Sequence, residues 1–299
     1  MKTLVAGASG FVGRRLCQAL DEAGHTVRAM TRRPEDHQGA GQPVGGDTQD
    51  PSSLLTALAG CDTAYYLVHS LDHDDFATRD ALAARNFGTA CARAGVERIV
   101  YLGGLGADDD RLSEHLRSRR QAEKLLATAG VPVTTLRAGI IVGHGGISWE
   151  MTRQLVERLP VMVTPRWVRT RTQPIAIADV VAYLVGVHDL PAATGRSFDI
   201  GGPEVLTYEG MMRRVALIEG RRLVLLPLPV LSPSLSSHWL SLVTDIDTRT
   251  GRSLVASMYN EVVVRDHDIE HLVPLRPMDY DQAVLAALGE RAAAARRES

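Results

Sequence analysis

The 299-residue sequence lacks the features that mark membrane, secreted and nucleic-acid-binding chains. No apolar run approaches the roughly 18 residues that a membrane-spanning helix needs. The formal net charge is −2, which gives no strong attraction to nucleic acid or to an anionic membrane. The only three cysteines, Cys17, Cys61 and Cys91, are widely spaced and predict buried thiols in a reducing cytoplasm. Strand-like sequence begins at the N-terminus, so we expect no signal peptide.

Three glycines at three-residue intervals, Gly7, Gly10 and Gly13, follow a short apolar segment near the start of the chain. Apolar residues then recur at helical spacing, which predicts a strand, a tight turn and a helix. In such a turn Gly7 takes dihedrals that a Cβ disfavours, Gly10 lets a ligand approach the backbone, and Gly13 lets the helix lie near the strand. The first N–H groups of the helix carry the positive end of its dipole. The turn, which also contains Ser9, Phe11 and Val12, therefore predicts a dinucleotide pyrophosphate site.

The stretch from Gly7 to Gly13 resembles the turn of the short-chain dehydrogenase/reductase superfamily, in particular its extended and atypical branches. These branches include epimerase-like reductases and NmrA-like redox sensors. Further resembling segments are 66–70, 101–106, 115–119, 149–151 and 173–175, and together they cover most of residues 1–260. The resemblance implies a Rossmann fold and a nicotinamide cofactor, and it implies almost nothing about the substrate.

The predicted second strand, 25–31, ends in Arg32 and Arg33. A NAD-binding unit usually has an acidic residue about 20 residues after the glycines, where it holds the ribose 2′-hydroxyl. Two guanidinium groups suit a 2′-phosphate instead. The alternative is a solvated strand end, where arginine is unremarkable. We expect NADP (NADPH) as the cofactor, with NAD less favoured.

Strand-like and helix-like segments alternate through the first two hundred residues. This alternation predicts an α/β fold with a Rossmann-type, doubly wound parallel sheet and a smaller C-terminal substrate-side lobe. The expected strands are 43–46, 63–68, 96–102 and 131–136, and the expected helices include 76–94 and 112–129. We expect the NAD(P)-binding domain to span 1–205, with a substrate-side insertion at 143–172, and the lobe to span 206–299.

Ligands of doubly wound sheets bind at the carboxyl ends of the strands. Residues at these ends are therefore expected to face the cofactor: Val68, His69, Gly103, Gly104 and Arg137. The family resemblance adds Asp47 and Thr48 on the adenine side. Residues 143–167 and 206–258 are expected to form the wall of a substrate pocket.

The common short-chain reductases use a Tyr-x-x-x-Lys pair on the helix after the fifth strand. Lysine is almost absent from this sequence, and Lys124, the only one in this region, has Arg120 four residues before it. Aligned on the family pattern, His115 stands at the tyrosine position and Arg119 at the lysine position. Two interpretations remain open: His115 is a substitute proton donor with a pKa near neutrality, beside the fixed cation Arg119, or the helix is a polar face without catalytic function. The first predicts turnover that rises as the pH falls toward about 6.

The resulting hypothesis is an NADPH-dependent oxidoreductase that reduces a small or medium apolar carbonyl, enone or quinone-like substrate. The alternative is a catalytically silent NADP(H)-binding redox sensor or scaffold. We expect a cytoplasmic protein without nucleic-acid or membrane partners, and a homodimer is possible. No metal is expected: His267, Glu270 and His271 match an H-x-x-E-H pattern, but Pro274 leaves too little helix to present both imidazoles.

Overall fold

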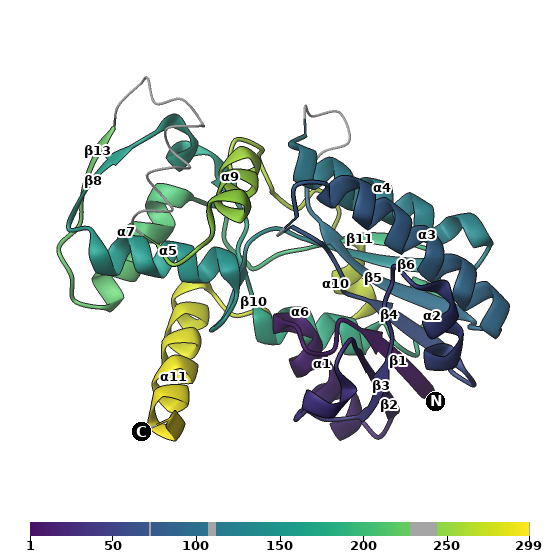
Figure 1. The fold of residues 1–299 in the computed structure, drawn as a ribbon. Coiled ribbons are helices and arrows are strands. Elements are labelled where there is room, and N and C mark those ends of the chain that lie inside the picture. The colour runs from purple at the N-terminus through teal and green to yellow at the C-terminus, as the bar shows by residue number, and fades with distance from the viewer. Residues whose placement is uncertain (72, 107–111, 228–243, 299) are drawn as a thin grey trace.

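A computed structural model describes residues 1–71, 73–106, 112–227 and 244–298 of the chain (Figure 1). Its centre is a seven-stranded sheet with the order β11-β6-β5-β4-β1-β2-β3. Every neighbouring pair in this sheet is parallel, which confirms the predicted doubly wound class. The strands are β1 (Lys2–Ala6), β2 (Thr26–Thr31), β3 (Gln42–Gly45), β4 (Thr63–Tyr66), β5 (Arg98–Gly104), β6 (Val133–Ala138) and β11 (Ser197–Ile200).

Helices cover both faces of the sheet, because the strands bury apolar side chains on both sides. Leu4 and Ala6 of β1 pack toward one face and Val5 toward the other. The first face is covered by α2 (Pro51–Leu58), α3 (Phe76–Ala94) and α4 (Glu114–Leu126). The second is covered by α1 (Phe11–Glu22), α6 (Ile177–Gly186) and α10 (Asp268–Leu272). All three cysteines are buried and free, as predicted.

A second group of elements forms a smaller lobe beside the sheet, on the left of Figure 1. The lobe contains α5 (Ile147–Arg158), α7 (Tyr208–Ile218), α9 (Thr248–Ser257) and α11 (Tyr280–Glu298), which share one apolar core. Its short strands are β7 (Ile141–Val142), β8 (Val161–Thr164), β9 (Arg171–Thr172), β10 (Ile175–Ala176), β12 (Leu206–Thr207) and β13 (Val224–Pro227). These strands form three separate pairs. The C-terminal residues do not all stay in the lobe, since Ile269 of α10 packs against the sheet core.

Several element boundaries differ from those expected. The strand predicted at 63–68 ends at Tyr66, and the following residues turn away to line a cavity. The strand predicted at 96–102 runs instead over 98–104, because Gly103 and Gly104 still pair with β6. The helix predicted at 112–129 begins at Glu114, with Ser113 as its N-cap.

None of the helices in the described ranges is long and apolar enough to cross a membrane.

Candidate functional site

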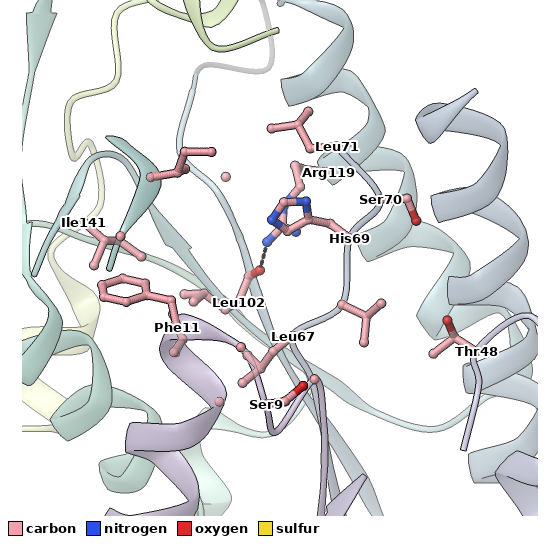
Figure 2. A pocket seen from close by; sticks show the side chains of 18 of the residues that line it. Ser9, Phe11, Thr48, Leu67, His69, Ser70, Leu71, Leu102, Arg119 and Ile141 are labelled. Carbon is pink, nitrogen blue, oxygen red and sulfur yellow. Dashed lines mark hydrogen bonds between the residues drawn. The ribbon is translucent and has the colours of Figure 1, made fainter. Parts of the chain in front are cut away.

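A cavity of about 630 Å³ lies at the carboxyl ends of β1, β4 and β5, between the sheet and the lobe (Figure 2). Phe11 and Ile141 lie on one side of it in this view and Thr48 and Ser70 on the other, with His69 and Arg119 between them. Most of the residues expected at the site line this cavity: Gly7, Ser9, Gly10, Phe11, Val12, Gly13, Arg32, Asp47, Thr48, Val68, His69, Gly103, Gly104, His115 and Arg119.

The glycine turn at one end of the cavity has the expected geometry. Gly7 has a φ of +89°, and a Cβ on Gly13 would collide with the Gly7 carbonyl oxygen. A Cβ on Gly10 would have only that carbonyl oxygen nearby, at 3.2 Å, so its remaining surroundings are open. Gly10 is also the N-cap of α1, whose first N–H groups have no partner further back in the helix. The turn therefore offers backbone donors and room for an anion.

A second hollow of about 530 Å³ adjoins this turn and shares Ser9, Thr31 and Arg32 with the main cavity. Arg33 lines this hollow rather than the main cavity, and its guanidinium lies 3.7 Å from the Asp36 carboxylate. Arg14 lines it too and was not among the predicted cofactor-binding residues. Its position on the exposed face of α1, directly after Gly13, is a signal that could have identified it. Three guanidinium groups thus surround one hollow beside the turn.

The loop after β3 forms another part of the wall. Its Asp47 carboxylate accepts a hydrogen bond from the Gln49 N–H at 2.9 Å, and the Asn86 amide donates to the Thr48 carbonyl at 3.0 Å. Asp50 caps the helix that follows, since its carboxylate accepts from the Ser52 N–H at 3.0 Å. These bonds hold Asp47 and Thr48 at the cavity. His73 and Arg79 also line this part and were not anticipated.

The opposite end of the cavity brings together two imidazoles and a guanidinium. His69 comes from the loop after β4, and His115 and Arg119 come from successive turns of α4. The two imidazole ring centroids are 6.3 Å apart. Arg119 donates to the Leu102 carbonyl, and its guanidinium lies over the Tyr101 ring, 5.2 Å from the centroid. Arg119 is therefore a cation fixed in place.

Both histidines are neutral at physiological pH. Burial among protein atoms and the nearby Arg119 guanidinium lower the pKa of His69 to about 4. The same two causes, with His69 as a third, lower the pKa of His115 to about 3. The predicted pKa near neutrality for His115 is therefore wrong, because the sequence does not show how deeply α4 places this ring. His69 nevertheless remains accessible from the cavity.

Asp80 connects the elements that carry these side chains. It is 5% exposed, accepts from the Ser70 N–H at 2.8 Å and lies 3.3 Å from the Ser118 hydroxyl oxygen, which donates to it. Ser70 follows His69, and Ser118 lies on α4 between His115 and Arg119. Burial raises the pKa of the Asp80 carboxyl group, and Arg119 opposes that rise. Asp80 was not a predicted site residue, although its position on the apolar face of α3, one helical turn from both Phe76 and Ala84, is a signal in the sequence.

The lobe supplies only part of the expected pocket wall. Of the two predicted ranges, Gly145, Gly146, Ile147, Ser148 and Leu254 line the cavity, while residues 228–243 lie outside the described residues. Trp149 and Trp167 are buried in the lobe core instead. The end of the cavity near His115 and Arg119 has an apolar wall. This wall consists of Phe11, Leu71, Ile141, Ile147 and Leu254.

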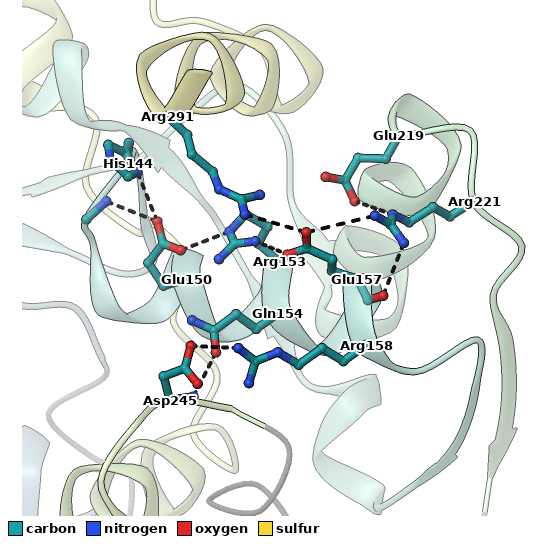
Figure 3. A network of polar contacts seen from close by, with 11 residues as sticks. His144, Glu150, Arg153, Gln154, Glu157, Arg158, Glu219, Arg221, Asp245 and Arg291 are labelled. Atoms are coloured by element: carbon teal, nitrogen blue, oxygen red, sulfur yellow. Dashed lines mark hydrogen bonds and ion pairs between the residues drawn. The ribbon is translucent and has the colours of Figure 1, made fainter. Parts of the chain in front are cut away.

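A charged network fixes the loop that precedes α5 (Figure 3). The Glu150 carboxylate accepts from the Gly145 N–H at 3.1 Å and contacts the His144 ring at 3.3 Å. Arg153 joins Glu150 to Glu157, and Glu157 in turn contacts Arg291 of α11. The cavity wall at residues 145–146 is therefore tied to the lobe.

Arg137 does not line the cavity, contrary to expectation. Its guanidinium forms two hydrogen bonds with the Glu123 carboxylate of α4, at 2.8 and 3.2 Å. The side chain of a strand residue points to one face of the sheet, and here that face is covered by α4. The sequence places Arg137 at the correct end of β6, but the ion pair directs it away.

The comparisons with known proteins give the family of the chain and two reductases that resemble it. A family model described as NAD(P)H-binding matches residues 7–182, more than half of the chain. A 2-alkyl-3-oxoalkanoate reductase of Stenotrophomonas maltophilia is 32% identical over 187 residues, which are 53% of this chain and 54% of that protein. This chain therefore spans only about half the length of that relative. A (4-alkanoyl-5-oxo-2,5-dihydrofuran-3-yl)methyl phosphate reductase of Streptomyces griseus is 29% identical over 232 residues, 74% of each chain.

The fold is shared with solved structures at low sequence identity. An NADPH-dependent quinone oxidoreductase from Escherichia coli, solved with NADPH, superposes with a TM-score of 0.76 at 19% identity. The superposition covers 95% of this chain and 98% of that one. This likeness confirms the predicted Rossmann-type fold.

Proposed function

We propose, on the premise that this chain belongs to the NAD(P)H-binding family, that it is an NADPH-dependent reductase of a small or medium apolar carbonyl, enone or quinone-like substrate. The observation that carries the proposal is the continuity of the main cavity. One cavity reaches from the glycine turn to His115 and Arg119, and its second end has an apolar wall. The two relatives described above are named as reductases, which supports the same class of reaction.

The residues present fit NADPH. The open backbone at Gly10 and the start of α1 suit the pyrophosphate. The hollow lined by Arg14, Arg32 and Arg33 suits a ribose 2′-phosphate, because guanidinium groups bind phosphate oxygens in pairs. Asp47 and Thr48 would hold the adenine side, and Val68, His69, Gly103 and Gly104 would face the nicotinamide side. When bound, NADPH supplies the hydride.

The chain's own residues would then act on the substrate oxygen. A neutral imidazole has one N–H donor, so His115 can donate a hydrogen bond to a substrate carbonyl without being charged. Burial, together with the fixed Arg119 guanidinium, keeps His115 neutral, and the guanidinium would stabilise negative charge that develops on the same oxygen. The wall around Phe11, Ile141 and Leu254 gives an apolar substrate a surface to pack against. The hydroxyl proton is supplied from solvent on the accessible side of the cavity, where His69 lies.

The test is turnover. The wild-type protein and the Gly10→Val variant are incubated with NADPH and a panel of aliphatic ketones, enones and quinones, and NADPH consumption is followed by absorbance. We expect at least one substrate class to be reduced by the wild type and none by Gly10→Val. NADPH binding without turnover across the panel would contradict the reductase function and favour the silent NADP(H)-binding alternative.

A further inference from the structure

A second cluster of chemically active side chains lies at the edge of the sheet opposite the cavity. His25 immediately precedes β2, and His188 and Asp189 follow α6. Among the residues that the structure describes, this is the one group of three or more His, Cys, Asp or Glu side chains with ligand atoms all within 4.8 Å of one another. It lies at the amino ends of the strands and shares no residue with the main cavity.

Three potential ligand atoms lie within 4.8 Å of one another. The His188 Nε2 atom is 3.5 Å from an Asp189 carboxylate oxygen, and the His25 Nε2 atom is 3.8 Å from the other oxygen. The two imidazole rings meet edge to face with centroids 4.2 Å apart. Ligand atoms of a tetrahedral zinc ion are separated by about 3.4 Å, given zinc–nitrogen and zinc–oxygen bonds of about 2.1 Å. Small side-chain rotations, above all of the half-exposed Asp189, would bring the three atoms to that spacing.

Buried hydrogen bonds orient His188 for this role. The Tyr65 hydroxyl donates to the Leu184 carbonyl at 2.9 Å, so it accepts from the His188 Nδ1–H at 3.1 Å. This bond fixes the tautomer and leaves Nε2 without a proton, with the potential ligand atoms of His25 and Asp189 within 4.8 Å of it. The Thr3 hydroxyl, 3.3 Å from Nε2, donates to that lone pair in the absence of a metal. A histidine whose second nitrogen is held by an outer hydrogen bond is the usual arrangement of a metal ligand.

We propose that His25, His188 and Asp189 bind a divalent transition metal ion of the zinc type, with water completing the coordination. Two imidazole nitrogens and one carboxylate oxygen form a donor set suited to Zn²⁺ rather than to Mg²⁺ or Ca²⁺. Asp189 is 53% exposed, which leaves an open route for the ion and its water. The bound ion joins the end of α6 to the start of β2 and therefore stabilises this edge of the sheet.

The experiment measures metal binding directly, and its result is independent of the proposed reductase function. Untagged protein is treated with a chelator, dialysed and titrated with CoCl₂, which reports coordination by its visible spectrum, and with ZnCl₂ by calorimetry. The same titrations are performed on His25→Gln and Asp189→Asn. Both positions are partly exposed, so the variants should fold, whereas a change at the buried His188 threatens the fold itself. Far-ultraviolet circular dichroism checks each variant.

The matched control is His271→Gln, which disrupts the H-x-x-E-H pattern at α10, a histidine motif that is not expected to bind metal. Wild type and His271→Gln should each bind one ion per chain, with a rise in melting temperature on adding ZnCl₂. His25→Gln and Asp189→Asn should each bind at least tenfold more weakly and lose that rise. Absence of stoichiometric binding in the wild type would overturn the proposal. Unchanged binding in His25→Gln, or loss of binding in His271→Gln, would do the same.

Discussion

The two ends of the main cavity are built from different parts of the chain. At the turn end, one continuous stretch, Gly7 to Gly13, lines the cavity, and its three glycines leave backbone uncovered by side chains. At the other end, the polar groups are side chains of His69, His115 and Arg119, which come from two elements separated by α3 and β5. A site made of local backbone depends on a few dihedral angles and on the absence of Cβ atoms. A site made of distant side chains depends on how the helices pack.

This difference determines which property each end should lose when one of its residues is substituted. At the turn end a single added side chain removes the space that the ligand needs. At the other end the cavity keeps its shape when a side chain is shortened, and only the chemistry is lost. The following substitutions separate the two ends.

Gly10→Val should have the largest effect. Two added methyl groups would occupy the open side of the turn, where the pyrophosphate must approach the backbone. We expect NADPH affinity to fall by at least about 100-fold with the fold intact, since the φ of Gly10 is −76° and suits any residue. Fluorescence titration and circular dichroism measure the two quantities. The control is Gly289→Val on α11, where an added Cβ meets nothing within 4 Å; equal affinities in the two variants would contradict the assignment of the turn.

His115→Ala should affect turnover and leave cofactor binding nearly unchanged. Loss of a hydrogen-bond donor aimed at the developing oxyanion should lower kcat by about 10²–10³-fold, as measured by steady-state kinetics on a substrate found in the panel. Because the pKa of His115 is about 3, wild-type kcat should show no change due to this group between about pH 5 and 8. A rise in kcat toward pH 6 would indicate an imidazolium donor instead. His271→Ala on the exposed face of α10 is the control and should keep wild-type turnover.

Replacing Arg32 and Arg33 by alanine should change the choice of cofactor. Two charge-assisted contacts to a 2′-phosphate are worth at least about 1.4 kcal/mol together, so NADPH affinity should fall tenfold or more. NADH affinity should stay the same, because NADH has no 2′-phosphate. Arg14→Ala should weaken NADPH binding in the same selective way. The exposed Arg85 of α3 provides a control, and a loss that is equal for NADH and NADPH would count against this phosphate site.

Asp80→Asn should have the smallest effect. The amide keeps one oxygen that can accept from the Ser70 N–H, while the bond from the Ser118 hydroxyl weakens. We expect kcat to fall about fivefold, the value of one hydrogen bond of about 1 kcal/mol, with NADPH affinity unchanged. Asp80→Glu should have a lower kcat than Asp80→Asn, because the longer side chain does not fit the buried site. A fall in NADPH affinity equal to the fall in kcat would show a general loss of structure.

The sequence predicted the sheet and the turn well because their signals are local. An apolar strand, glycines at fixed spacing and an amphipathic helix are each recognisable within about ten residues. The boundaries of β4 and β5 were less accurate. Tyr66 ends β4 because the chain then leaves the sheet to form the cavity, and Gly104 stays in β5 because β6 pairs with it. Neither the position of the cavity nor the pairing with β6 can be read from the sequence of the strand itself.

The sequence by itself determined the fold class, the glycine turn between β1 and α1 and the absence of a Tyr-x-x-x-Lys pair, since each follows from residues that are close in the chain. Tertiary structure alone decided the pKa of His115, the ion pair that turns Arg137 away from the cavity, and the use of Asp80 to join α3, α4 and the loop after β4. These properties depend on burial and on charges contributed by other elements. Burial and charge act through space, and only the folded chain brings those groups within a few ångströms of one another.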